Sequence, residues 1–390
     1  MQYLNSNRKV NKDYLVNEQQ LEELFNENEE DINQIKANTD YVHSGKNKTK
    51  NLIETIQAFL RDMHVDGYVL KYPHGVVIRQ GERRNYYRGE AEDYPTSKTS
   101  LYRELDNCKN DDEKQVVKIV ARMRFVLFRN FLQRIRYVKE WEQTFGNPYY
   151  EAIAQHYGFL TEYLDITNDF NVAMFFACCI WDKDKKEWRP LTKTECEEKK
   201  EGVLYHAPAT NVMLSFDVDG QPAPYVIPIG YQPFYRCQKQ VGYVKYMKEG
   251  EDFKDDLIFE KLKFKHSENL SNGIFHYMRE GRDIYPDEAL LYFDEEIEAL
   301  QQTLSFSTDV FDKAIEELEL SDKRDELLRI IKKVDFCAGN HLYRNIEIED
   351  GLVSVHIARQ KINRFNLKNE GRSPEKDNGI KLSSRLCCKI

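Results

Sequence analysis

Polar side chains are concentrated between residues 155 and 179, which read QHYGFLTEYLDITNDFNVAMFFACC. The groups there that could do chemistry are His156, Tyr157, Thr161, Asp165 and Thr167. An apolar helix is predicted to follow, with Thr167 or Asn168 as its N-cap and Asp169 in its first turn. The segment is either a capped core helix with a hydrogen-bonded histidine or a nucleotide site, because a helix N-terminus presents free N–H groups to phosphate.

A single arginine precedes a glycine in the aromatic segment Tyr87-Arg88-Gly89. The Arg88 guanidinium can form a bidentate pair with a phosphate or a carboxylate, and a glycine lets a ligand approach the backbone closely. An ion pair between a buried Arg88 and Asp165 would explain the same residues as structure. A third segment, residues 236 to 243, has Gln and Gly interrupting strand-like aromatic residues and says little by itself.

The three segments, in this order, resemble the FRG domain family over roughly residues 81 to 290. The matching motifs are Tyr87-Arg88-Gly89, Ser100-Leu101-Tyr102-Arg103, the block QHYGFLTEYLDITNDFNVAMFFA, the later Arg236 with Gln240 and Gly242, and Tyr285-Pro286-Asp287. Three positions depart from the family pattern: Glu90 stands where Gln is common, Leu160-Thr161-Glu162 replaces Pro-Thr-Arg, and Ile166 replaces Trp. Glu162 removes a positive charge, and with it any role that the family gives to that charge.

The same order of motifs is similar to ADP-ribosyltransferases of the Arg-Ser-Glu type. That similarity implies NAD as a substrate, with Arg88 holding its phosphates and Thr161 or Thr167 in the Ser/Thr position. Gln240 takes the late position, and Asp165 is the acidic candidate, since an oxocarbenium-like sugar needs a carboxylate or polar group beside it. The implied catalytic residues are Arg88, Asp165 and Gln240. The implied NAD-binding residues are Tyr87, Arg88, Gly89, His156, Tyr157, Thr161 and Thr167.

The resemblance implies a bacterial effector, a toxin or an antiviral defence protein, that transfers ADP-ribose to a protein or nucleic-acid acceptor or hydrolyses NAD. A second hypothesis is a non-catalytic nucleotide-binding or signalling module. In a third, the helical flanks of the core bind a regulatory partner or a second copy of the chain. Release of nicotinamide from NAD separates the first hypothesis from the others.

The apolar periodicity places these motifs on elements. It is helical from 18 to 62, strand-like from about 68, helical from 112 to 145, strand-like again from 202 to 228 and helical after 287. This order predicts an α/β (α+β) fold, and the resemblance implies an ADP-ribosyltransferase-like core with a bent, split sheet. The predicted organisation is a helical segment at 1–65, the FRG core at 66–295, a helical segment at 296–365 and a mobile tail at 366–390.

Composition limits the alternatives. The net charge of −9 argues against a broad basic surface for nucleic acid. The longest apolar stretch is shorter than the roughly 20 residues that span a bilayer, and the first residues are too polar for a signal peptide, so no membrane contact and a cytoplasmic location are expected. The eight cysteines form no CxxC pair and no zinc-ligand spacing, which favours structural thiols and no metal site.

Overall fold

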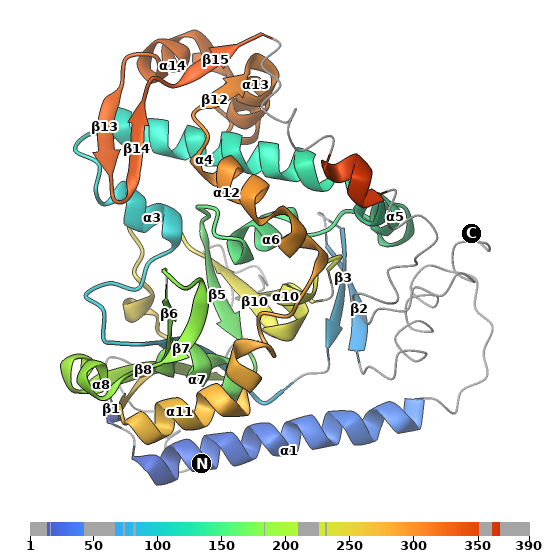
Figure 1. The fold of residues 1–390 in the computed structure, drawn as a ribbon, viewed down its shortest axis with the longest axis vertical. Coiled ribbons are helices and arrows are strands. Elements are labelled where there is room, and N and C mark those ends of the chain that lie inside the picture. The colour runs from blue at the N-terminus through green and yellow to red at the C-terminus, as the bar shows by residue number, and fades with distance from the viewer. Residues whose placement is uncertain are drawn as a thin grey trace.

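The computed structural model describes residues 14–15, 17–42, 67–72, 75–80, 83–182, 184–209, 226–230, 232–350 and 361–366. Within them the fold is a mixed α/β arrangement around one large sheet (Figure 1). The predicted second N-terminal helix near residue 56 and the predicted tail lie outside the described residues, apart from Asn366. No helix in the described part of the chain is long and apolar enough to cross a membrane.

The large sheet has the order β1-β11-β8-β4-β5-β10-β9. Its strands are β1 (Tyr14–Leu15), β11 (Glu260–Lys265), β8 (Glu201–Pro208), β4 (Asn85–Glu90), β5 (Tyr163–Thr167), β10 (Gly242–Tyr246) and β9 (Ile227–Pro228). The short β1 runs parallel to β11, and all other neighbours are antiparallel. Strands β4, β8 and β10 each contain three or more consecutive buried residues, because the sheet is covered on both faces.

The sheet opens at its centre, between β4 and β5. Strand β4 pairs with β8 along its whole length, from Asn85 to Glu90, whereas it pairs with β5 through Tyr87 and Thr167 alone. Beyond that pair the two strands diverge, so the ends that carry Glu90 and Tyr163 are not joined by ladder hydrogen bonds. Ladder pairing between β4 and β5 is therefore limited to this one position.

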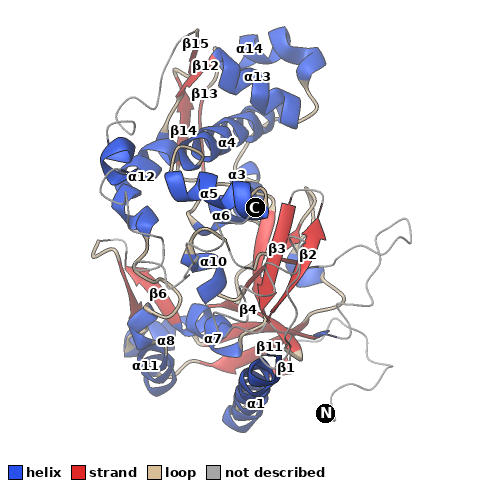
Figure 2. Ribbon diagram, turned by 90° about the vertical axis from the view of Figure 1, so that its right-hand side faces the viewer, coloured by secondary structure: helices blue, strands red, loops and turns tan. Residues whose placement is uncertain are grey.

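Helices cover both faces of the sheet (Figure 2). On one face, α7 (Phe170–Cys178) packs against β4 and β8, with α11 (Glu268–Tyr277) and α1 (Glu18–Val42) outside it. On the other face lie α3 (Ser100–Leu105), α4 (Asp111–Leu132), α6 (Tyr150–His156) and α10 (Tyr235–Lys239). Alternation along β4 explains this division, since Tyr87 belongs to the first cluster and Tyr86 to the second.

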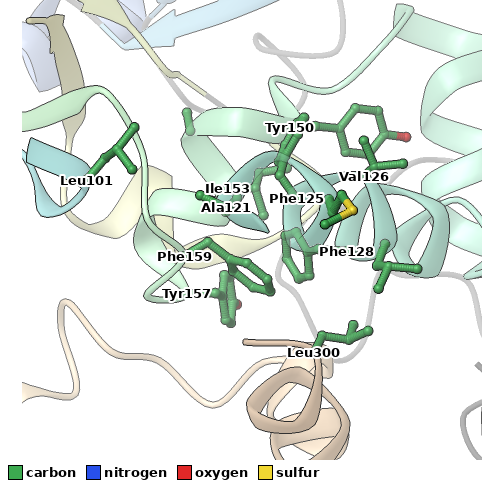
Figure 3. Packing of buried hydrophobic residues seen from close by; sticks show 14 of the residues in the cluster. Leu101, Ala121, Phe125, Val126, Phe128, Tyr150, Ile153, Tyr157, Phe159 and Leu300 are labelled. Atoms are coloured by element: carbon green, nitrogen blue, oxygen red, sulfur yellow. The ribbon is translucent and has the colours of Figure 1, made fainter. Parts of the chain in front are cut away.

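The largest cluster of apolar side chains surrounds α4 (Figure 3). Phe128 of α4 packs on Phe159 with ring centroids 4.5 Å apart, and Leu300 of α12 (Asp294–Gln302) belongs to the same cluster. The predicted 112–145 helix is interrupted, because α4 ends at Leu132 and α5 begins at Arg136. Arg124 is buried and donates to the carbonyl oxygen of Thr303, at 3.1 Å.

The C-terminal part contains strands as well as the helices predicted from its periodicity. Its helices are α12, α13 (Thr308–Glu317) and α14 (Arg324–Ile331), and its strands are β12 (Ser305–Ser307), β13 (Asp335–Ala338), β14 (His341–Arg344) and β15 (Glu347–Glu349). β12 pairs with β15 in parallel, and β13 forms a hairpin with β14. All three helices contact α4 and share its core cluster, so this part is continuous with the core and not a separate cap.

The remaining elements are two hairpins, one helix and four short 3-10 helices. The hairpins are β2–β3 (Gly67–Tyr72 and Gly75–Gln80) and β6–β7 (Cys179–Asp182 and Glu187–Pro190). The helix is α8 (Lys193–Lys199), and the 3-10 helices are η1 (Phe253–Asp255), η2 (Arg279–Gly281), η3 (Ala289–Phe293) and η4 (Ser321–Lys323). The β6–β7 hairpin follows α7 directly and so stands beside the opening in the sheet.

Candidate functional site

A cavity of about 680 Å³ lies where β4 and β5 diverge. Residues of β4, β5, α7 and the β6–β7 hairpin line it, together with the segment from Ala91 to Ser97. Seven of the predicted site residues reach this cavity: Tyr87, Arg88, Gly89, His156, Asp165, Thr167 and Gln240. Residues that are up to 153 positions apart in sequence, Tyr87 and Gln240, therefore share one concave space, which is the usual form of a ligand site.

Two arginines stand side by side on the cavity wall. Arg88 donates through Nη1 to the main-chain oxygen of Asp165 at 2.9 Å, so its side chain bridges the opening between β4 and β5. Arg103, from the last turn of α3, is exposed, and its Nη1 donates to the carbonyl of Lys98. The pKa of Arg103 lies below its ordinary value because desolvation and the nearby Arg88 both disfavour its charge. Two adjacent cations of this kind suit an anion with two charged groups.

Two carboxylates face the same space. Glu90 is 6% exposed, and its Oε1 accepts from Arg88 Nε at 3.1 Å and from Ser97 Oγ at 2.5 Å. Asp165 Oδ2 accepts from Gln155 Nε2 at 3.3 Å. Among the described residues, neither Glu90 Oε2 nor Asp165 Oδ1 has a hydrogen-bond partner, although both atoms are buried. Buried oxygens without partners are costly in a core, and in a cavity they are free to bind a ligand.

The predicted ion pair between Arg88 and Asp165 is not formed. Arg88 meets the main chain of Asp165, and its carboxylate partner is Glu90. The sequence reasoning treated Glu90 as a departure from the family pattern and gave it no role. Its position at the end of an aromatic strand could have indicated a role for Glu90, because a strand in the middle of a sheet seldom buries an unpaired carboxylate.

His156 contributes a neutral imidazole. Desolvation lowers its pKa, so at neutral pH the ring carries no charge, and its Nε2 makes no hydrogen bond to the described residues. Gln240 lies beside it, and the main-chain oxygen of Gln240 accepts from Thr167 Oγ1 at 2.8 Å. This bond fixes Thr167 against the backbone, so the Thr167 hydroxyl already has a partner.

Gly89 has a packing role that sequence reasoning did not predict. A Cβ at this position would lie 1.8 Å from the carbonyl oxygen of Ala173 in α7, so the glycine lets the helix backbone approach β4. Tyr87, its neighbour, is 1% exposed and packs edge-to-face on Phe170. Close packing of α7 on β4 therefore requires a glycine at position 89, whether or not a ligand approaches its backbone.

Two predicted site residues lie outside the cavity. Thr161 donates to Gln155 Oε1, and since Gln155 donates to Asp165, Thr161 supports the site indirectly. Tyr157 is buried and donates its hydroxyl to Glu288. The Arg236 guanidinium packs over the Tyr157 ring at 4.2 Å and donates to the His156 carbonyl at 2.9 Å. Arg236 and Glu288 therefore fix the position of the segment around His156, although neither residue lines the cavity.

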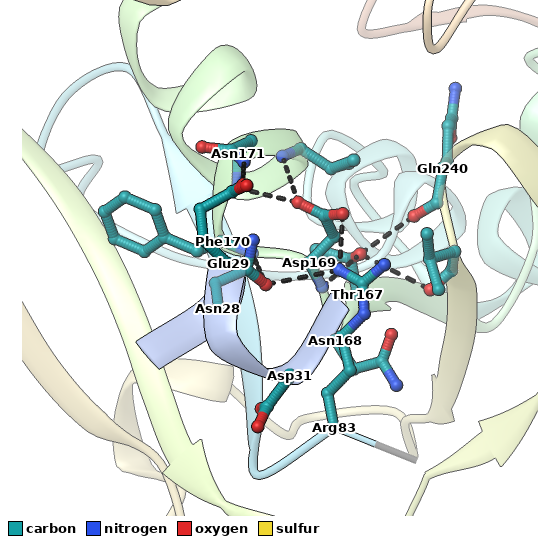
Figure 4. Close-up of polar contacts among 12 residues, drawn as sticks. Asn28, Glu29, Asp31, Arg83, Thr167, Asn168, Asp169, Phe170, Asn171 and Gln240 are labelled. Atoms are coloured by element: carbon teal, nitrogen blue, oxygen red, sulfur yellow. Dashed lines mark hydrogen bonds and ion pairs between the residues drawn. The ribbon is translucent and has the colours of Figure 1, made fainter. Parts of the chain in front are cut away.

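The N-cap of α7 is Asp169, and not the predicted Thr167 or Asn168. Asp169 Oδ1 accepts from the backbone N–H groups of Asn171 at 2.8 Å and Val172 at 3.3 Å. The N–H of Phe170 donates to Asn28 of α1 (Figure 4). These three N–H groups are satisfied within the protein, so they are not available to a phosphate.

An aromatic wall completes the cavity. It consists of Phe176 on α7 with Trp181 and Trp188, which face each other across the β6–β7 hairpin. The ring centroids of the two tryptophans are 5.7 Å apart, and Trp181 is 45% exposed. The sequence analysis did not predict this wall, although Trp181 and Trp188 stand on either side of a short polar segment that could form a turn.

Other chemistries find no support at this site. Burial raises the pKa of Cys179 to about 12, which keeps the thiol of this cavity residue protonated and a poor nucleophile. In the ranges that the structure describes, no three His, Cys, Asp or Glu side chains gather as a metal site would require.

Comparison with known proteins gives one match. Residues 83–186 match the model of the FRG domain family, while no curated protein and no solved structure matches the chain significantly. The match begins at Arg83, just before β4, and ends in the turn of the β6–β7 hairpin. It is shorter than the expected range of about 81 to 290, so Gln240 and Gly242 lie beyond it. Arg88, Glu90, Arg103, His156 and Asp165, the polar side of the cavity, all lie within the residues that match the FRG domain model.

Proposed function

We propose that this cavity binds NAD and that the protein breaks its nicotinamide–ribose bond, transferring ADP-ribose to an acceptor or to water. The observation that supports this most is the presence, in one cavity, of two adjacent arginines and of two carboxylates that each keep one buried oxygen without a partner among the described residues. A pyrophosphate needs the first pair, and a sugar that develops positive charge needs the second.

The proposed roles follow from position. Arg103 and Arg88 hold the pyrophosphate, and Asp165 stabilises the oxocarbenium-like ribose when nicotinamide departs with the electrons of the broken C–N bond. A nucleophile then forms the new bond to the same ribose carbon, and its proton passes to the neutral imidazole of His156. Gln240 contributes a polar contact and no charge, so the acidic role falls to Asp165 rather than to the late position.

The decisive measurement is nicotinamide release from NAD by the purified full chain, with transfer of labelled ADP-ribose followed in parallel. Asp165→Asn should lower the rate at least about a hundredfold, because it removes the charge that stabilises the transition state. Arg103→Gln should mainly weaken NAD binding, roughly ten- to a hundredfold. Asp309→Asn and Arg344→Gln change exposed residues of the same types far from the cavity in sequence and serve as controls.

A second candidate is a nucleotide-binding module without turnover. The Arg88 guanidinium already forms hydrogen bonds to Glu90 and to the backbone of β5, so its position is fixed before any ligand arrives. A fixed arginine favours a site that binds a ligand without rearranging during a reaction. This module would bind NAD or ADP-ribose and release no nicotinamide. Absence of binding by the wild type would exclude both candidates.

The role of a toxin or antiviral effector stays a prediction that follows from the family resemblance. Its test is expression of the wild type and of Asp165→Asn in bacteria, with growth, cellular NAD and phage plaque numbers measured together. The proposal expects growth arrest or phage protection with the wild type and neither with the variant. Equal effects of the two proteins would dissociate the role from NAD chemistry.

A further inference from the structure

The aromatic wall is more extensive than a short hairpin needs for its own stability. Tyr285 joins it, with its ring 5.3 Å from that of Trp188 and 6.4 Å from that of Trp181. Phe176 lies 5.7 Å from Trp188 and 6.4 Å from Tyr285. These four rings pack together, and three of them, Phe176, Trp181 and Trp188, line the cavity, where Trp181 remains 45% exposed. Exposed aromatic surface inside a cavity is a feature of ligand subsites.

The hairpin that carries the tryptophans is held rigidly. Arg189 on β7 forms two hydrogen bonds of 2.8 Å to the carboxylate of Glu195 in α8. Asp182 closes the turn by accepting from the N–H groups of Asp184 and Lys185 at 3.1 Å. The tryptophan rings therefore stand on a fixed platform, which lowers the entropic cost of stacking a planar group on them.

The wall adjoins the carboxylate end of the polar site. Gln240 Nε2 donates to the carbonyl oxygen of Ile284, the residue before Tyr285, at 3.3 Å, and the main-chain oxygen of Gln240 accepts from Thr167 Oγ1 of β5 at 2.8 Å. Arg103 interacts electrostatically with Asp165 and also with Tyr94, another exposed aromatic residue of the cavity. The cavity thus has an aromatic surface connected through Gln240 to β5, and a second exposed aromatic ring, Tyr94, near Arg103.

We propose that the surface formed by Phe176, Trp181 and Trp188, with Tyr285 packed behind it, binds the departing base of the ligand, the nicotinamide ring. This inference rests on the proposed function. A base attached to a ribose carbon held at Asp165 meets this surface first, and an electron-poor cationic ring stacks favourably on indole. The pyrophosphate then runs toward Arg88 and Arg103, and the adenine end approaches Tyr94.

The test uses separate halves of the dinucleotide as probes of the full chain. Tryptophan fluorescence is followed during titration with NAD, nicotinamide mononucleotide and ADP-ribose. The chain has three tryptophans, and Trp141 is buried in α5 at 3% exposure, so quenching by a ligand in the cavity reports on Trp181 and Trp188. The proposal expects strong quenching by NAD and the mononucleotide and little by ADP-ribose.

Two matched variants separate the ends of the cavity. Trp181→Ala should weaken NAD and mononucleotide binding about 5- to 100-fold and leave ADP-ribose affinity unchanged, whereas Trp181→Phe should retain most of the affinity. Tyr94→Ala, which truncates another exposed cavity aromatic, should have the opposite selectivity. Binding is measured by calorimetry, so the test does not depend on turnover.

The outcomes distinguish the inference from the function beneath it. If NAD binds but Trp181→Ala leaves its affinity unchanged, the subsite is wrong and the proposed function survives. If Trp181→Ala weakens ADP-ribose and spares the mononucleotide, the adenine occupies the wall and the assigned orientation is wrong. If the wild type binds none of the three probes, the proposed function fails, and the subsite fails with it.

Discussion

Arg88 connects the two strands that border the cavity. Its Nε contacts Glu90 on its own strand, and its Nη1 contacts the backbone of β5. The Arg88 side chain is 17% exposed and the Glu90 side chain 6%, so the pair lies largely out of solvent. Arg88 therefore contributes to stability as well as to any ligand, and loss of ligand binding in an Arg88 variant is not sufficient evidence for a binding role.

Arg88→Ala should lower the free energy of unfolding by about 3 kcal/mol, because it leaves the buried Glu90 carboxylate without its counter-charge. Arg88→Ala/Glu90→Gln should recover much of that loss, since a neutral amide needs no cation. Urea unfolding of the two variants and of Glu90→Gln measures the effect. A double variant as unstable as Arg88→Ala would show that the ion pair is not the source of the loss.

Gly89→Ala should destabilise the protein by about 1 to 3 kcal/mol or more, because the new methyl group meets the Ala173 carbonyl and must displace α7 from the sheet. Gly273→Ala on α11 is the matched control, since a Cβ there meets no atom within 4 Å and alanine favours a helix. Thermal melts of the two variants should diverge. Similar melting temperatures would contradict the assigned packing role.

At the scale of elements, α1 is an integral support for the site. Asn28 Oδ1 accepts from Arg83 at 3.2 Å and from the N–H of Phe170 at 3.2 Å (Figure 4). Asp31 accepts from the backbone and side chain of Arg84 at 2.8 and 2.6 Å. The helix thus ties the start of β4 to the start of α7, although the FRG match begins only at residue 83.

Asn28→Ala should cost about 1 to 3 kcal/mol of stability, because it leaves the buried N–H of Phe170 without a partner. Asn26→Ala removes the same type of side chain from an exposed position on the same helix and should be close to neutral. Chemical denaturation compares them. If both changes are neutral, α1 does not support the N-terminus of α7.

Periodicity was sufficient to predict the strands around Arg88 and the apolar helix after Asp165, because buried strands and helices repeat their apolar residues in different ways. It could not identify the cap of α7. Thr167, Asn168 and Asp169 are all good caps by type, and the position of the cap depends on where β5 ends. That end is fixed by pairing of Thr167 with Tyr87 and Gly242, contacts between segments that are distant in sequence.

The same limit explains the other differences. The short β12 and β15 strands pair across about 40 residues, and no local pattern specifies such a partner. Glu90, Trp181 and Trp188 line the cavity because of how the chain folds, and no sequence motif pointed to them. Arg88, His156, Thr161, Asp165 and Gln240, in contrast, were predicted for one site from family resemblance; four of them line the cavity, and Thr161 does not.

At the scale of the whole molecule, buried histidines should make stability depend on pH. Burial lowers the pKa of His206 to about 4, and it also lowers the pKa values of His156 and His266. The unfolded chain binds these protons near pH 6.5, whereas the folded chain binds them only at lower pH. Stability is therefore complete above about pH 6.5 and is lost as the pH falls toward 4.

His206 should account for about 1 to 3 kcal/mol of this loss. His206→Gln should flatten the dependence of melting temperature on pH between 6.5 and 4, and His276→Gln, at an exposed position, should leave it unchanged. Calorimetric melts across this range provide the comparison. An equally steep profile in His206→Gln would assign the acid sensitivity to other groups.

The single pairing of Tyr87 with Thr167 has a mechanical consequence. The part of the sheet that ends in β4 and the part that begins with β5 are joined by this one pair of residues. A rotation of one part against the other would therefore break no row of ladder hydrogen bonds. The Arg88 side chain connects the two parts through its hydrogen bond to the β5 backbone. An anion that draws Arg88 away would break this hydrogen bond and leave the two parts freer to move. Ligand affinity and the angle between the two parts are then coupled, and amide hydrogen exchange in β4 and β5 would record that coupling.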